Sequence, residues 1–126
     1  MRTLVCFRTE QGAYALPVES TVAVRLASGL VPLPGSFPDV AGVLPGQPPL
    51  TVLTTLGRGR HHVLVVRSHG RDYGLLVDEV TGLRLVSSDD VGPPPTGQDR
   101  RFFTGMLQRD SEVVLIADPV ALAGQL

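Results

Sequence analysis

The hydrophobic residues of this chain fall into short runs of strand length, separated by turns rich in glycine, proline and polar residues. In several runs apolar and polar residues alternate, as at Val22, Val24 and Leu26, and a period of two is typical of a β-strand. The pattern predicts about nine or ten strands. They are expected at residues 4–9, 14–18, 21–26, 52–53, 62–66, 72–77, 82–86, 102–108 and 112–117. Asp118 followed by Pro119 predicts the N-cap and first residue of a short helix that continues to Ala123. The expected fold class is all-β, as a barrel or a pair of small barrels.

Two segments, residues 28–49 and 87–98, are too rich in proline and glycine to be read as the interior of a sheet. Proline has no backbone N–H to donate to a strand ladder, so both segments are predicted to be ordered loops. The Gly-Arg-Gly-Arg sequence at 57–60 predicts a solvated turn. Residues 68–71 predict a hairpin turn.

The segment 72–83, Asp-Tyr-Gly-Leu-Leu-Val-Asp-Glu-Val-Thr-Gly-Leu, joins two apolar stretches through an acidic pair. It predicts a buried strand, a polar corner at Asp78-Glu79, and a return strand whose turn requires Gly82. The predicted core takes residues of one parity in each strand, as burial of one face requires. These residues are Val63, Val65, Leu75, Val77 and Leu115.

Composition and charge narrow the classes of function. A net charge of −1 argues against general affinity for nucleic acid or an anionic membrane, although all 11 basic residues are arginine. Hydrophobic residues make up 43% of the chain, but no run approaches the ~20 apolar residues of a membrane helix, so no membrane insertion is expected. A single cysteine, Cys6, excludes an internal disulfide. The N-terminus does not resemble a signal peptide, and the expected localisation is cytoplasmic.

The chain also lacks the residue clusters that carry catalysis. His61 and His62 are adjacent, so a strand would direct them to opposite faces, and no Gly-x-Ser-x-Gly elbow is present. Adjacent carboxylates at 78–79 and 89–90 would splay apart rather than form an acid–base pair. The sequence therefore predicts a protein that is not an enzyme and needs no cofactor or metal. One alternative stays open, a small-barrel RNA-binding module that uses Arg58, Arg60 and the two histidines.

The segment Gly-Leu-Leu-Val-Asp-Glu-Val at 74–80 resembles, nearly residue for residue, a characteristic segment of the CheW-like domain family. Residues 14–18, the triple proline at 93–95, and the segments 102–105 and 114–118 follow the family in order and spacing. The resemblance implies a single CheW-like domain over 1–126, divergent and of minimal length. It implies two small antiparallel SH3-like β-barrel subdomains that share a core, with a short C-terminal helix. The subdomain hinge is expected near 57–61, with the C-terminal segment returning to the first subdomain.

The family resemblance also implies function: a non-enzymatic adaptor or scaffold of a bacterial chemosensory pathway, which couples a CheA-like histidine kinase to chemoreceptors. Two departures fall on surfaces that the family uses for receptor contact. Ala23 stands where a glutamate is usual, and Leu44-Pro45-Gly46 replaces the family's Asn-Leu-Arg-Gly turn. We therefore expect stronger binding to the kinase regulatory domain than to a receptor cytoplasmic tip. A second alternative is a degenerate domain that acts only by self-association.

The residues expected to contact a partner come from the third strand, the loop around the changed turn, the acidic corner and the penultimate strand. They are Arg25, Val31, Phe37, Leu44, Gly46, Asp78, Glu79 and Gly105.

Overall fold

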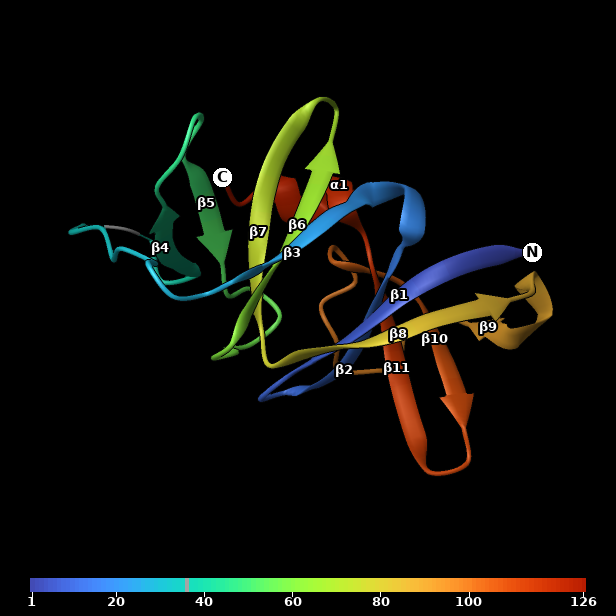
Figure 1. Cartoon of the computed structure of the whole chain (residues 1–126). Helices are drawn as coiled ribbons and strands as arrows, with labels where there is room; N and C mark the ends of the chain where they lie inside the picture. Colours follow the sequence, from blue (N-terminus) through green and yellow to red (C-terminus); the bar gives the residue numbers. More distant parts are fainter. Residues whose placement is uncertain (36) are drawn as a thin grey trace.

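The computed structural model describes residues 1–35 and 37–126, with the exception of the Arg109 side chain, and consists of two sheets and one short α-helix (Figure 1). The first sheet has the strand order β8-β1-β2-β11-β10-β9. Its strands are β1 (Arg2–Thr9), β2 (Gly12–Pro17), β8 (Glu79–Val86), β9 (Val91–Gly92), β10 (Phe103–Arg109) and β11 (Glu112–Ala117). The second sheet has the order β3-β6-β7-β5-β4. Its strands are β3 (Thr21–Leu26), β4 (Val40–Leu44), β5 (Leu50–Leu53), β6 (His62–Ser68) and β7 (Arg71–Val77).

Neighbouring strands are antiparallel except at two places, where β11 lies parallel to β2 and β5 lies parallel to β7. Two 3₁₀ turns, η1 (Val18–Ser20) and η2 (Ser88–Asp90), connect strands, and α1 (Pro119–Ala123) follows the last strand. The predicted all-β class, with two small SH3-like halves and a C-terminal helix, is confirmed.

The buried side chains form three clusters, because the central strands are covered on both faces. One cluster lies within the first sheet and includes Leu4 and Ile116, and another lies within the second sheet and includes Val63 and Leu76. The third cluster, the shared core, joins the two sheets. It contains Val5, Phe7, Tyr14, Leu16, Leu53, Leu56, Leu64, Val66, Tyr73, Leu75, Val77, Phe102, Phe103, Leu115, Ala117 and Leu122.

The five residues predicted for the core are all buried, but the premise that one face of each strand is buried is wrong. Val63 and Val65 belong to the cluster of the second sheet, whereas Leu64 and Val66 point into the shared core. Burial of successive residues explains why the central strands read as continuous apolar runs rather than alternating ones.

The C-terminal helix begins as the sequence predicts. The Asp118 side chain accepts a hydrogen bond of 3.0 Å from the backbone N–H of Val120, and Pro119 is the first helical residue. The buried Tyr73 hydroxyl donates a hydrogen bond of 2.7 Å to the Pro119 carbonyl oxygen. The tyrosine thus fixes the start of the helix against the strands of the second sheet.

Two strands lie in segments that were predicted to be loops. β4 pairs with β5 as the outermost strand of the second sheet, and the two-residue β9 pairs with the outer side of β10. The proline and glycine content of both segments hid these strands. Proline and glycine are tolerated at these strands because an edge strand has one side without a neighbouring strand, where a missing backbone N–H breaks no hydrogen bond of the sheet.

The segment 57–60, predicted to be a solvated turn, is instead packed between the two sheets, and that prediction is wrong. Gly57 and Gly59 are buried, whereas the side chains of Arg58 and Arg60 are exposed. A Cβ atom on Gly59 would collide with the backbone of Val77, and one on Gly57 would lie 2.7 Å from the Thr9 hydroxyl oxygen. The two glycines therefore allow the backbone of this segment to pack closely against its neighbours, while the two arginine side chains between and after them extend into solvent.

The acidic corner at Asp78 is where the chain leaves the second sheet and enters the first. β7 ends at Val77 and β8 begins at Glu79, and the Asp78 N–H donates a hydrogen bond of 2.8 Å to the Arg8 carbonyl oxygen. The predicted return strand exists, but it pairs with β1 and not with β7, so the two strands do not form a hairpin. Gly82 has a φ of 143° beside a bulge in the β1–β8 ladder, where glycine is the residue best able to adopt this backbone.

Candidate partner-binding surfaces

Two edge strands expose a row of aliphatic side chains each. On β3, Val22, Val24 and Leu26 are 45%, 48% and 67% exposed, and on β8, Leu83 and Leu85 are 70% and 60% exposed. β3 is the edge of the second sheet and β8 is the edge of the first (Figure 1). Exposed aliphatic side chains that gather on two edges are typical of a protein-binding surface rather than of scattered surface residues.

The strand register places both rows on the same side of their sheets. Val24 is opposite Leu64 of β6, and Leu83 is opposite Val5 of β1, and both of these partners point into the shared core. Side chains that oppose each other across a ladder share a face. The rows on β3 and β8 therefore extend the apolar face between the sheets out to solvent, and we call them together the edge surface.

A second group of exposed apolar side chains lies in the segment that leads into β4. Val31 is 47% exposed, Leu33 is 47% exposed and Phe37 is 77% exposed. Val31 is held by two backbone hydrogen bonds of 2.9 Å with Val43, so its exposure belongs to an ordered backbone. Two of the residues expected to contact a partner, Val31 and Phe37, are thus available on the surface.

The remaining residues expected to contact a partner are dispersed. Gly46 lies in the exposed turn between β4 and β5, and Arg25 is exposed on β3. Leu44 is only 2% exposed and belongs to the cluster of the second sheet. Gly105 is also buried, and a Cβ atom there would lie 2.6 Å from the Val91 side chain. Neither Leu44 nor Gly105 offers surface to a partner, because in both cases the apolar or small residue serves internal packing.

Asp78 and Glu79 border a shallow pocket together with Arg60 and His61. The ring of His62 is oriented by contact of its Nδ1 with the Asp78 carbonyl oxygen at 3.3 Å. Arginine and carboxylate side chains thus lie close together at the junction of the sheets. This mixed charge does not resemble the continuous positive surface that phosphate binding requires.

Among the described residues, no three His, Cys, Asp or Glu side chains gather in a way that could hold a metal ion. Cys6 is buried in the cluster of the first sheet, and this burial raises the pKa of its thiol. Burial also raises the pKa of the Tyr73 hydroxyl well above its usual range, and the nearby Asp118 carboxylate adds to the effect. These shifts have structural causes and do not mark reactive groups.

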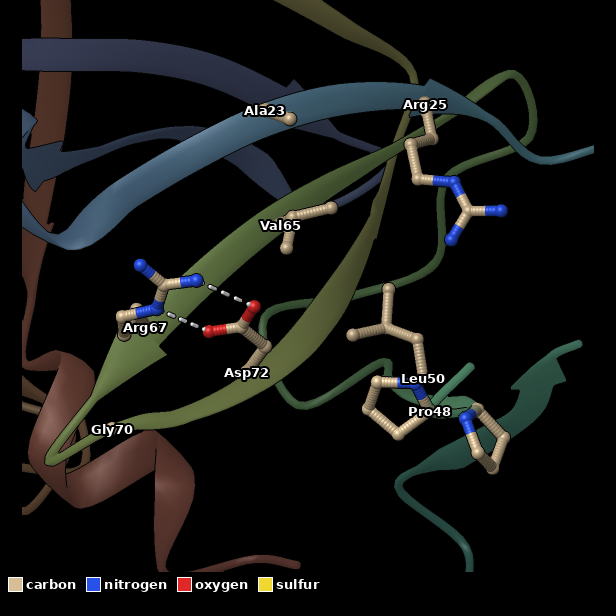
Figure 2. Close-up of a pocket in the computed structure, with 9 residues that line it drawn as sticks. Ala23, Arg25, Pro48, Leu50, Val65, Arg67, Gly70 and Asp72 are labelled. Atoms are coloured by element: carbon tan, nitrogen blue, oxygen red, sulfur yellow. Dashed lines mark hydrogen bonds and ion pairs between the residues drawn. The ribbon is translucent and has the colours of Figure 1, made fainter. Parts of the chain in front are cut away.

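A groove lies on the other face of β3, where Arg25 and Ala23 alternate with the residues of the edge surface. Across from Arg25, the Arg67 guanidinium donates hydrogen bonds of 2.6 and 3.0 Å to the two carboxylate oxygens of Asp72 (Figure 2). These hydrogen bonds lower the pKa of Asp72 and keep it ionised.

Comparison with known proteins identifies the family of this chain. The family model described as CheW-like domain matches residues 44–126. The chain belongs to the CheW-like domain family. Its fold is similar to that in the crystal structure of scaffolding protein TtCheW from Thermoanaerobacter tengcongensis, with a TM-score of 0.81 and 20% sequence identity over 93% of this chain and 84% of that one. No curated protein matches the chain.

Family membership agrees with the resemblance drawn from the sequence, and it makes this domain one of a group of chemotaxis and signal-transduction scaffolds. Within the described part of the chain, no helix is both long and apolar enough to cross a membrane.

Leu83 and Leu85 were not among the residues expected to contact a partner. Their alternation with Arg84 predicted a strand, and an alternating strand is normally read with its aliphatic residues facing the core. In the structure the leucines are exposed, whereas Val86 lies in the cluster of the first sheet. No local signal identifies the two leucines, because their exposure follows from the position of β8 at the edge of the first sheet.

Proposed function

We propose that this CheW-like domain is a non-enzymatic adaptor of a bacterial chemosensory pathway, which couples a CheA-like histidine kinase to chemoreceptors in the cytoplasm. The observation that carries the proposal is the edge surface, where five aliphatic side chains of two sheet edges are exposed on the side of the shared core. An adaptor needs surfaces that bind without performing chemistry, and exposed strand edges with aliphatic side chains provide them.

The side chains of the edge surface are large enough to supply binding energy when a partner covers them. Complete burial of one valine or leucine side chain contributes about 1.5–3 kcal/mol relative to leaving it exposed. Each residue of the edge surface is about half exposed or more, so a partner that covers the surface has apolar area left to bury. A charged residue introduced there would remove this gain and add the cost of an unpaired buried charge.

We further propose that the kinase regulatory domain is bound more strongly than a receptor tip. Ala23 stands where the family usually has a glutamate, and the Leu44-Pro45-Gly46 turn lacks the family's arginine. A charge-assisted hydrogen bond contributes about 1.5–3 kcal/mol, so its loss lowers affinity about ten- to a hundredfold. We also retain as a proposal that residues 1–126 act as one domain whose two halves meet near 57–61.

The proposal is tested by capture of the cognate kinase regulatory domain and of a receptor-tip fragment on the immobilised protein. We expect both to bind, the kinase domain more tightly, and we expect Leu83→Glu or Val24→Glu to weaken at least one of them about tenfold or more. Val113→Glu is the matched control, because Val113 is 42% exposed on β11 and lies outside the edge surface. Circular dichroism verifies that each variant is folded.

Capture of neither partner would overturn the proposal. Receptor binding equal to or tighter than kinase binding, and abolished by Arg25→Ala, would overturn the proposed order of affinities. Two further assays address the alternatives. A salt-sensitive gel shift with single-stranded RNA would favour an RNA-binding module, and self-association without either partner would favour a degenerate domain.

A further inference from the structure

The groove on the second sheet is separate from the edge surface, although both involve β3. Successive residues of a strand point to opposite faces, so Ala23 and Arg25 face away from Val22 and Val24. Ala23 is opposite Val65 of β6 in the ladder, and both residues line the groove. The strand β3 therefore presents one surface on each face.

The floor of the groove is aliphatic. Ala23, Val65 and Leu50 line it, and Figure 2 shows Val65 and Leu50 between Arg25 and the Arg67–Asp72 pair. The groove has a volume of about 600 Å³, which is within the range of ligand-binding pockets in proteins. Pro48 and Pro49 form part of its rim and have no backbone N–H groups that an aliphatic ligand would leave without a partner.

The charges in the groove do not balance within the protein. Asp72 is neutralised by Arg67 through the bidentate pair. Arg25 is exposed and makes no ion pair among the described residues. One positive charge with a planar, five-donor guanidinium therefore remains unmatched beside an aliphatic floor, and this group is suited to bind a carboxylate with two hydrogen bonds.

We propose that this groove binds an extended peptide segment of a partner protein, in which an aspartate or glutamate pairs with Arg25 and a neighbouring aliphatic side chain packs on Ala23, Val65 and Leu50. A polyanion such as a nucleic acid fits less well, because the groove offers one unpaired cation and places the carboxylate of Asp72 beside it. A purely aliphatic segment would leave Arg25 without a partner. The combination of one carboxylate and one aliphatic residue satisfies both parts of the site.

The groove is tested by selecting peptides from a phage-displayed library of random seven-residue sequences on the intact protein. We expect the enriched peptides to carry an aspartate or glutamate next to leucine, isoleucine or valine. Replacing that acid by its amide should weaken binding at least tenfold, which corresponds to about 1.4 kcal/mol. Arg25→Ala should cause a similar loss.

Two variants separate the contributions of charge and shape. Ala23→Phe places a large side chain in the groove without changing the charge, and it should also abolish binding of the selected peptide. Arg71→Ala is the matched control, because Arg71 is exposed on β7 next to Asp72 and its side chain points to the other face of the strand. This variant should bind the peptide within about twofold of the original protein.

Enrichment of sequences without acidic residues, absence of any enriched sequence, or equal binding to Arg25→Ala would overturn the proposal. Loss of peptide binding in Val24→Glu but not in Arg25→Ala would place the site on the edge surface, and it would overturn the proposal as well. Failure of this inference can be distinguished from failure of the proposed adaptor function, since selected peptides can bind the groove where capture of the kinase domain fails, and the reverse.

Discussion

A single methyl group added at Gly59 is expected to destabilise this domain severely. Its Cβ atom would overlap the backbone N, Cα and C atoms of Val77, and backbone atoms cannot swing aside as a flexible side chain can. The conformation of Gly59 itself is not the obstacle, because its φ is not among the positive values in the chain. The effect of Gly59→Ala is therefore steric.

The loss of stability can be estimated from the displacement that the added methyl group would force between the segment 57–60 and Val77. Overpacking of a close-packed site costs about 1–3 kcal/mol. Separation of the two segments also strains the hydrogen bonds beside the contact, which run from the His61 N–H to the Val77 carbonyl at 3.3 Å and from the Asp78 N–H to the Arg8 carbonyl at 2.8 Å. Loss of one of them adds about 0.5–1.5 kcal/mol. Gly59→Ala should therefore reduce the free energy of unfolding by about 2–4 kcal/mol, a large part of the 5–15 kcal/mol typical of a domain.

Urea denaturation followed by circular dichroism measures this change, with Gly92→Ala as the control. Gly92 also lies in a strand, has no heavy atom within 4 Å of a built Cβ, and has no positive φ, so its replacement should alter stability by less than about 0.5 kcal/mol. In a chain of 126 residues the expected loss for Gly59→Ala corresponds to a Tm lower by roughly 8–16 °C. A Gly59→Ala protein as stable as Gly92→Ala would refute the close contact between the segment 57–60 and β7.

Two further predictions concern the second sheet. Tyr73→Phe removes the hydroxyl that donates to the Pro119 carbonyl at 2.7 Å and leaves this oxygen without its partner, so unfolding in urea should become easier by about 1–3 kcal/mol; a change below about 0.5 kcal/mol would contradict the role of Tyr73 in fixing the helix. Asp72→Asn removes the ion pair with Arg67, which at these exposed positions makes only a small contribution to stability. Because Arg67 lowers the pKa of Asp72 in the folded protein, this stability is fully present above the unfolded pKa of about 3.9 and is lost as the pH falls from there through the lower pKa of the folded protein. Stability curves of the two proteins that stay parallel from pH 7 to pH 3 would count against the pair.

The strands were predictable where the local pattern and the tertiary environment agree. β3 and β11 lie at the predicted residues, and so does the helix that begins at Pro119. The local signals are alternation in β3, a short apolar run in β11 and a capping pair at the start of the helix. β4 was not predictable from its proline-rich surroundings, because only its position at the edge of the sheet makes those surroundings acceptable.

The surfaces were harder to predict than the strands, because exposure depends on which elements cover a strand. Leu44 and Leu83 are the same residue type, and the sequence alone does not distinguish them. Leu44 is buried within the second sheet, whereas Leu83 is 70% exposed at the edge of the first. The family resemblance predicted partner contacts in the loop around Leu44, whereas the exposed aliphatic rows of the structure lie at the edges of the two sheets. Arg25, Val31 and Phe37 were expected to contact a partner, and all three are exposed in the structure.

The two sheets differ in whether their strands are contiguous in the sequence. The second uses one uninterrupted stretch, from β3 to β7, whereas the first takes β1 and β2 from the beginning and β8 to β11 from the end. During synthesis the β1–β2 hairpin leaves the ribosome before the other strands of this domain, and both of its outer neighbours, β8 and β11, are translated only after the whole second sheet. Until then both edges of the hairpin have open backbone groups and aliphatic residues. The nascent hairpin is therefore the part of this protein most exposed to mispairing with another chain.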